Sequence, residues 1–310
     1  MNAMAASSGI TSRPRRHGWW WKALLAGLGL WGITVWVTAV TLNSNLIPTL
    51  IMIGSFLVPF CVVLFILERL VGNVTTLQVI LAFVVGGICG ILGASLLEAS
   101  LPASIFTYVG VGFIEEFVKG VILVVIGWRV VPKTAGQGAL LGSAVGAGFA
   151  AFESAGYAFN AVITVEGFDL ATMLQTEALR AMLTPVGHVL WTAILGAVLF
   201  AAARGHTRFR FRFSVIAAYG VVALLHALWD SMSGITSFVA LLLTGTTIAE
   251  MRFGFIPPGS QQEASSLGSV LYVAGVALTA ILGIAILWRV LVHHARAGRA
   301  VRPQQAGFAA

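Results

Sequence analysis

Seven ionisable side chains lie inside stretches of sequence that are otherwise apolar. They are Glu115, Glu116, Lys119, Glu153, His188, His226 and Asp230. Two histidines together with several carboxylates support two sorts of chemistry. One is hydrolysis, in which a metal ion or a carboxylate base activates a water molecule. The other is a pathway for protons or cations.

Helical spacing places several of these groups on common faces. Glu115 and Lys119 are four residues apart and share one face of a helix, whereas Glu116 points about 100° away. His226 and Asp230 are also four residues apart. At this spacing one helical face presents two ligands to a metal, or a catalytic pair to a substrate. The pattern therefore predicts that helices carry the chemistry.

The composition indicates the environment of these helices. Of the 310 residues, 58% are hydrophobic and 9% are charged, and the mean hydropathy is +0.95. A soluble protein carries about 25% charged residues, so a soluble enzyme, a nucleic-acid-binding module and a disordered protein are excluded. Cys61 and Cys89 lie in apolar runs and are interpreted as small hydrophobic residues. The sequence predicts an all-α fold, a polytopic membrane bundle of about eight transmembrane helices.

Eight apolar stretches are long enough to span a bilayer, for which about 20 residues are needed. They cover residues 19–42, 48–67, 77–97, 104–131, 137–160, 180–203, 213–233 and 268–292. We expect one membrane domain over residues 19–292, between a basic N-terminal tail at 1–18 and a basic C-terminal tail at 293–310. The shorter apolar stretch 235–249 is expected to be an external, partly buried loop or short helix.

The basic residues indicate how the spans are oriented. With both termini inside, fifteen lysines and arginines lie on the cytoplasmic side, and only Arg180 and Arg252 lie in external loops. The external loops then hold Glu98, Glu166, Asp169, Glu177, Glu250 and Glu263. An excess of basic residues inside is typical of multi-pass proteins. We therefore expect a cell-membrane protein with cytoplasmic N- and C-termini.

The ionisable groups are predicted to lie in the same half of the membrane. Measured from the external end of each span at about 1.5 Å per residue, Asp230 lies roughly 3 Å deep and Glu115 about 17 Å deep. His226, Glu153 and His188 lie between them, about 9–12 Å deep. Each charged group would cost about 2.5–3.5 kcal/mol if it faced lipid. We therefore expect them to face one another around a single site.

The order of the polar motifs resembles that of a known family. Residues 115–119 read EExxK, residues 152–157 read FExxxY, His188 follows, and residues 226–230 read HxxxD. Over about residues 105–233 this series resembles the PrsW family of intramembrane metalloproteases, which is related to the CAAX prenyl endopeptidases. The resemblance implies an intramembrane protease that cuts a membrane-anchored protein or peptide near the external face of the bilayer.

The resemblance also implies roles for individual residues. Glu115 would be the general base that activates water, and His188 would help to hold that water. His226 and Asp230 would occupy the place of the pair that stabilises the oxyanion, although the relatives have Asn where this chain has Asp230. An ionised Asp repels an oxyanion, so Asp230 would be protonated, orient His226 or bind a cation. Lys119 would neutralise the glutamate pair.

Glu116 and Glu153 complete the expected catalytic set. A glutamate with two histidines is an ordinary ligand set for catalytic zinc with one open position, and the family is classed as metalloproteases. The expected metal ligands are Glu115, His188, His226 and Asp230. The prenyl endopeptidase relatives imply a metal-free glutamate mechanism instead, so bound Zn²⁺ and a metal-free site both stay open.

Two other functions would use the same polar cluster, namely a non-catalytic membrane scaffold and a proton-coupled transporter. A scaffold has no need of both glutamates and both histidines. A transporter predicts Gly/Pro-interrupted helices in matching halves, and only Pro185-Val186-Gly187 has this character. The alternating aromatic and basic residues 209–213 are interpreted as contacts to lipid phosphates. The expected partners are a membrane-anchored substrate and membrane lipids, with no nucleic acid.

Overall fold

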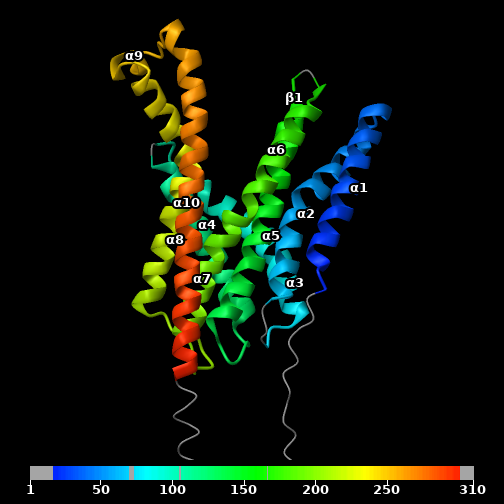
Figure 1. Ribbon diagram of the computed structural model, residues 1–310, viewed down its shortest axis with the longest axis vertical. Helices are drawn as coiled ribbons and strands as arrows, with labels where there is room; N and C mark the ends of the chain where they lie inside the picture. The colour runs from blue at the N-terminus through cyan, green and yellow to red at the C-terminus, as the bar shows by residue number, and fades with distance from the viewer. Residues whose placement is uncertain (1–16, 70–72, 105, 166, 301–310) are drawn as a thin grey trace, which may run out of the picture.

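Helices, most of them long, account for most of the described chain, which comprises residues 17–69, 73–104, 106–165 and 167–300 of this computed structural model (Figure 1). They are α1 (Trp19–Thr41), α2 (Ile47–Leu67), α3 (Thr76–Glu98), α4 (Thr107–Gly127), α5 (Ala135–Val162), α6 (Leu170–Leu183), α7 (His188–Ala202), α8 (Phe213–Leu243), α9 (Ile248–Arg252) and α10 (Pro258–Ala300). Residues 1–16 of the expected N-terminal tail, residues 301–310 of the C-terminal tail, and Glu166 lie outside the described residues.

Short elements connect some of these helices. Two 3₁₀ turns, η1 (Ser44–Leu46) and η2 (Thr184–Val186), precede α2 and α7. Strands β1 (Ile163–Thr164) and β2 (Gly167–Phe168) form a small antiparallel pair between α5 and α6. The prediction of an all-α polytopic membrane bundle is confirmed.

Seven segments of the described chain are long and apolar enough to cross a membrane. They are α1, η1 with α2, α3, α5, α6 with α7, α8, and α10. The remaining long helix, α4, contains Glu115, Glu116 and Lys119, which make it too polar to be counted by composition. All three side chains are buried, and α4 packs between α3 and α8. We therefore interpret α4 as the eighth crossing.

The sixth span differs from its predicted bounds of 180–203. It begins at Leu170 and is broken at Thr184–Gly187, so that α6 and α7 together cover Leu170–Ala202. Arg180 and Glu177 therefore lie on a helix within the bundle, and the prediction that they belong to an external loop is wrong. Glu177 is 2% exposed and accepts a hydrogen bond of 2.9 Å from Trp31 Nε1. These polar residues are accommodated because they face neighbouring helices instead of lipid.

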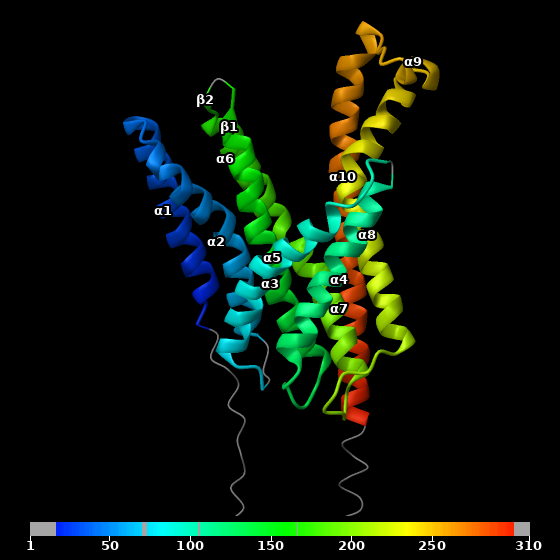
Figure 2. The same ribbon diagram turned by 180° about the vertical axis from the view of Figure 1, so that it is seen from behind.

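The predicted loop at 235–249 also differs from the structure. Helix α8 continues without interruption to Leu243, and only residues after it form the turn that leads to α9. With 31 residues, α8 is longer than the roughly 20 needed to cross a bilayer. Figures 1 and 2 show α8 and α10 rising together to α9 at the far end of the molecule.

Helix α5 lies at the centre of the bundle, with α1–α3 on one side and α8 and α10 on the other (Figures 1 and 2). Its contact with α7 depends on glycine. A Cβ at Gly138, Gly142 or Gly146 would collide with backbone carbonyl oxygens of α7, the last of them with that of His188. Small residues let transmembrane helices approach closely and gain packing energy. The glycine face of α5 therefore positions the start of α7, where His188 lies.

We predict that the C-terminus is cytoplasmic, because the basic residues would lie inside in this orientation. A fluorescent reporter fused after Ala310 should fold and emit in the cytoplasm, and alkaline phosphatase fused there should be inactive. Phosphatase inserted at Gly254, in the turn between α9 and α10, should be active. Phosphatase activity at the C-terminus would contradict the orientation.

Candidate functional site

A polar cavity of about 330 Å³ opens between α4, α5, α6, α7 and α8, with the end of α3 at its edge. Glu115, Glu153, His188 and Asp230 lie on its wall. Glu116, Lys119 and His226 are not part of the wall and lie behind it, each no more than 1% exposed. The structure thus brings all seven sequence-predicted residues to one place, with some of them facing the cavity and others buried beneath it.

Lys119 lies at the centre of the buried layer. Its Nζ is 3.2 Å from Glu115 Oε2, 2.7 Å from Glu116 Oε1 and 3.0 Å from His188 Nδ1. These three acceptors match the three N–H donors of an ammonium group. The Phe149 ring lies under the same ammonium, 4.2 Å from Nζ to the ring centroid. The spacing that places Glu115 and Lys119 on one helical face thus results in a direct ion pair.

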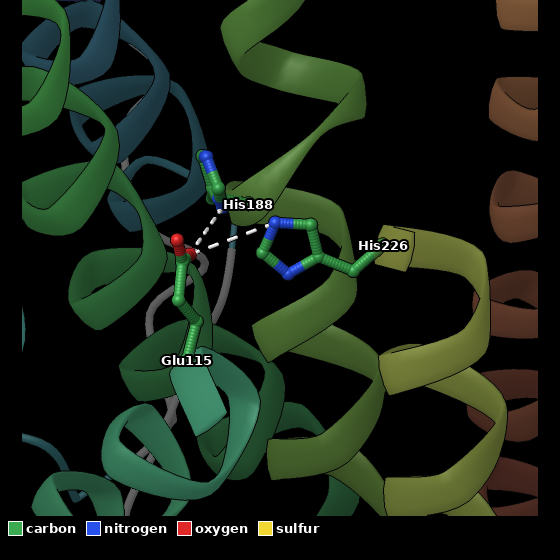
Figure 3. A group of neighbouring side chains, drawn as sticks. All are labelled: Glu115, His188 and His226. Atoms are coloured by element: carbon green, nitrogen blue, oxygen red, sulfur yellow. Dashed lines mark ion pairs between the residues drawn. The ribbon is translucent and has the colours of Figure 1, made fainter. Parts of the chain in front are cut away.

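Each histidine has one ring nitrogen on a carboxylate and the other turned toward Glu115. His188 Nε2 lies 2.9 Å from Glu153 Oε2, and His226 Nδ1 lies 3.1 Å from Glu116 Oε1. The opposite nitrogens, His188 Nδ1 and His226 Nε2, are 3.8 Å and 3.6 Å from Glu115 Oε2 (Figure 3). A carboxylate on the far side of a histidine fixes the tautomer and orientation of the ring, as at many metal sites.

Asp230 lies one helical turn beyond His226 on α8, and its Oδ2 is 3.3 Å from His226 Nε2. Its side chain is 25% exposed, on the cavity wall. His226 Nε2 is buried and has no hydrogen-bond partner of good geometry among the described residues. Three acceptors, this nitrogen and the nearest oxygens of Glu115 and Asp230, therefore face one another, an arrangement that calls for a proton or a cation between them.

Sequence reasoning missed Arg180 as a site residue, and it also placed Glu98 in an external loop, whereas Glu98 ends α3 and lines the cavity. Arg180 has the more extensive contacts of the two. It projects from α6, forms an ion pair with Glu153 and donates a 2.9 Å hydrogen bond from Nε to Ser154 Oγ. Its guanidinium carbon, Cζ, also lies 4.1 Å from the centroid of the Tyr157 ring. The signal that could have revealed it is the helix start. Asp169 accepts a hydrogen bond from Thr172 N and caps α6, and a helix beginning there contains Arg180.

The donor set fits a divalent metal ion. One carboxylate oxygen of Glu115 and one nitrogen each of His188 and His226 lie within 4.8 Å of one another, and glutamate with two histidines is a common catalytic zinc set. The charges agree with this. With neutral histidines, the four carboxylates Glu115, Glu116, Glu153 and Asp230 exceed the two cations Lys119 and Arg180 by two negative charges, and Glu98 on the cavity wall adds a further carboxylate. Buried charge of this kind needs neutralisation, which a divalent cation provides.

Comparison with known proteins gives one match. A family model described as PrsW family intramembrane metalloprotease matches residues 18–253, which is well over half of the 310 residues and includes every residue of the site. The comparisons with curated proteins and with solved structures found no match.

We predict that the purified protein binds about one zinc ion per chain, and that Glu153→Gln weakens zinc binding about 10–100-fold, because losing the partner of a ligating histidine has this effect. Competition with a chromogenic chelator measures the affinity, and elemental analysis measures the stoichiometry. Glu263→Gln, at an exposed position near the start of α10, is the control. Equal zinc binding by the wild type and by a His188→Ala, His226→Ala double variant would contradict the metal site.

We also predict that Arg180→Gln weakens zinc binding about tenfold, because Glu153 loses the guanidinium that fixes it against His188. Arg180→Lys keeps the charge but cannot reproduce the planar fork that contacts both Glu153 and Ser154, so it should recover only part of the affinity. The same chelator assay, with thermal unfolding to monitor folding, tests this. A zinc affinity of Arg180→Gln equal to that of the wild type would show that Arg180 does not support the metal ligands.

Proposed function

The chain belongs to the PrsW family of intramembrane metalloproteases, and from this premise we propose that it hydrolyses a peptide bond of a membrane-anchored protein near the external face of the bilayer. The observation that supports this most strongly is the convergence of Glu115, His188 and His226 beside a polar cavity, with Glu115 and His188 on its wall and His226 directly behind it. A cavity of about 330 Å³ has room for an extended peptide segment together with the water that attacks it.

In the proposed mechanism the water molecule attacks the carbonyl carbon of the scissile bond and Glu115 accepts its proton. Glu115 is suited to this role because its carboxylate lies on the cavity wall while Lys119 contacts it from behind. The His188 and His226 nitrogens that face Glu115 hold the water from the other side. General-base assistance of this kind contributes about 10²–10⁴-fold to a rate.

Glu115, His188 and His226 would also hold the metal ion that the family name implies, with Asp230 nearby as a further oxygen donor. Zinc at this position would polarise the peptide carbonyl and acidify the attacking water. Glu116 and Glu153 would hold the two rings in place. The contact between Lys119 and His188 Nδ1 has to yield when that nitrogen binds a metal, and the zinc titration above tests this directly.

Asp230 is assigned to proton transfer. An ionised carboxylate would repel a developing oxyanion, so Asp230 is unsuited to the role that an asparagine could have at this position. Its contact with His226, whose Nε2 also faces Glu115, suits it instead to receive the proton that Glu115 takes from water. From the cavity wall Asp230 then passes this proton to the nitrogen of the departing amine when the C–N bond breaks. The water proton taken up by the site is thereby returned to the product.

The proposed site of cleavage follows from the orientation of the bundle. Asp230 lies 17 residues after the start of α8, which is about 26 Å from the end that carries Arg210 and Arg212. With these arginines in the cytoplasm, the cavity lies toward the external face. The substrate class that fits is a protein anchored by one membrane span, whose bond near the external interface can enter the cavity.

We predict that Glu115→Gln abolishes cleavage of a single-span substrate, with a loss of at least about 10²–10⁴-fold, because glutamine cannot accept the water proton. Glu116→Gln should cost less, about 10–100-fold, because Glu116 orients His226 and pairs with Lys119 but does not line the cavity that holds the water. Cleavage is measured with purified protein in proteoliposomes.

Thermal unfolding of both variants controls for folding, and Glu263→Gln controls for the loss of a carboxylate elsewhere. If Glu115→Gln retains near-normal cleavage while His226→Ala is inactive, the base is another carboxylate of the site. If all of these variants cleave normally, the polar cluster is structural and the protease assignment to this site is wrong.

A further inference from the structure

Helices α4 and α8 are in close contact where Gly112 meets Ala223, and they separate toward the end of the bundle that carries Arg210. A Cβ at Gly112 on α4 would collide with the backbone of α8 near Ala223, 2.5 Å from its carbonyl oxygen. One turn further along, Tyr219 Oη donates a 2.8 Å hydrogen bond to the Phe113 carbonyl, and the two rings meet edge to face. Beyond Tyr219 the helices diverge toward the end of the bundle that carries Arg210.

The divergence leaves an apolar groove of about 390 Å³ with α7 as its floor. It is lined mainly by Phe117, Val121, Val125, Leu195, Leu199 and Ile216. Along α4 the groove runs from Glu116 to Val125, nine residues or about 14 Å. That length is close to one leaflet of a hydrocarbon core about 30 Å thick. The groove therefore has the depth and the polarity of the space that one lipid chain occupies.

Two arginines without an ion-pair partner among the described residues flank Phe211 at one end of the groove. Phe211 lines the groove and is 69% exposed, and Arg210 and Arg212 flank it in the sequence and are both exposed. Neither arginine forms an ion pair with any carboxylate in the described part of the chain. Arginines next to a lipid-facing groove attract the phosphates of anionic lipids.

Buried contacts hold this arginine-bearing loop in place. Lys133, which is fully buried, donates hydrogen bonds of 2.8 Å to the Val130 carbonyl and 2.9 Å to the Thr207 carbonyl, and so joins the loop before α5 to the loop before α8. Phe209 packs against Phe200 of α7, with ring centroids 5.2 Å apart. The position of Arg210 and Arg212 beside the groove is thus a built feature of the fold.

We propose that the groove between α4 and α8 binds one anionic phospholipid from the leaflet at the arginine end, with an acyl chain in the groove and the phosphate at Arg210 and Arg212. The complementary charge at the mouth favours this occupant over a neutral lipid. The shape favours it over a transmembrane helix, whose diameter of about 10–12 Å over a 14 Å length exceeds the volume available. The proposal does not depend on the protease function.

The test is native mass spectrometry of the full-length protein in detergent, titrated with palmitoyl-oleoyl-phosphatidylglycerol and with phosphatidylcholine of the same chains. We expect preferential retention of one phosphatidylglycerol. Arg210→Gln with Arg212→Gln should weaken its binding about 30-fold, since an arginine near anionic lipid contributes roughly fivefold. The matched control is Arg289→Gln with Arg296→Gln, which removes equal charge from exposed positions on α10 and should change binding less than twofold.

A second pair of variants tests the groove itself. Val121→Trp fills it and should abolish preferential retention, whereas Ile284→Trp, at a lipid-facing position of α10, should not. Equal retention of both lipids, unchanged binding in the Arg210, Arg212 variant, or equal loss in the Arg289, Arg296 control would each overturn the proposal. Unchanged phosphatidylglycerol binding in Val121→Trp would show that no acyl chain enters the groove, and it would overturn that part of the proposal. Loss of substrate-helix binding in Val121→Trp without loss of phosphatidylglycerol would identify the groove as a helix site.

Discussion

The neutralisation of buried carboxylates by Lys119 is the interaction on which the rest of the structure depends. Glu116 is 0% exposed and Glu115 is 5% exposed, and neither could remain ionised at this depth without a cation within contact distance. Lys119 contacts both of them and also His188 of α7. Glu116 in turn contacts His226 of α8. Because removing one partner of a buried pair costs about 3–5 kcal/mol, this network fixes α4 against α7 and α8.

The network can form only because the helices approach closely enough to bring short polar side chains together. On α5, the glycines that touch the α7 backbone recur every four residues and end at the carbonyl of His188. On α4, Gly112 meets the α8 backbone at Ala223, three residues before His226. Each histidine therefore lies within one helical turn of a contact between a glycine and the backbone of the histidine's own helix, and this contact fixes its position. Without such contacts the helix axes would separate by at least a side-chain layer, and the distances of 3–4 Å in the site would be lost.

The sequence allowed the helix faces to be predicted but not all of the partners. The four-residue spacing of Glu115 with Lys119 and of His226 with Asp230 depends on a single helix, so local periodicity was sufficient to pair them. The ion pair between Glu153 and Arg180 joins two helices, and no local pattern indicates it. The same holds for Glu177 and Trp31, which are 146 residues apart in sequence. The start of α6 was missed because its 14 residues include Glu177 and Arg180, which lower the apolar signal of the window.

The two adjacent glutamates mark a boundary between the polar and the lipid-facing sides of the bundle. Glu115 lies on the wall of the polar cavity, whereas Glu116, about 100° further around α4, lies at the inner end of the apolar groove. Water that enters the cavity can therefore reach Glu115, while Glu116 is hydrogen-bonded to Lys119 and His226 and borders the groove. A general base must be within hydrogen-bond reach of the water that it deprotonates. The assignment of Glu115 as the base thus rests on access to water, and a filled groove would reinforce it by keeping the lipid-facing side of α4 dry.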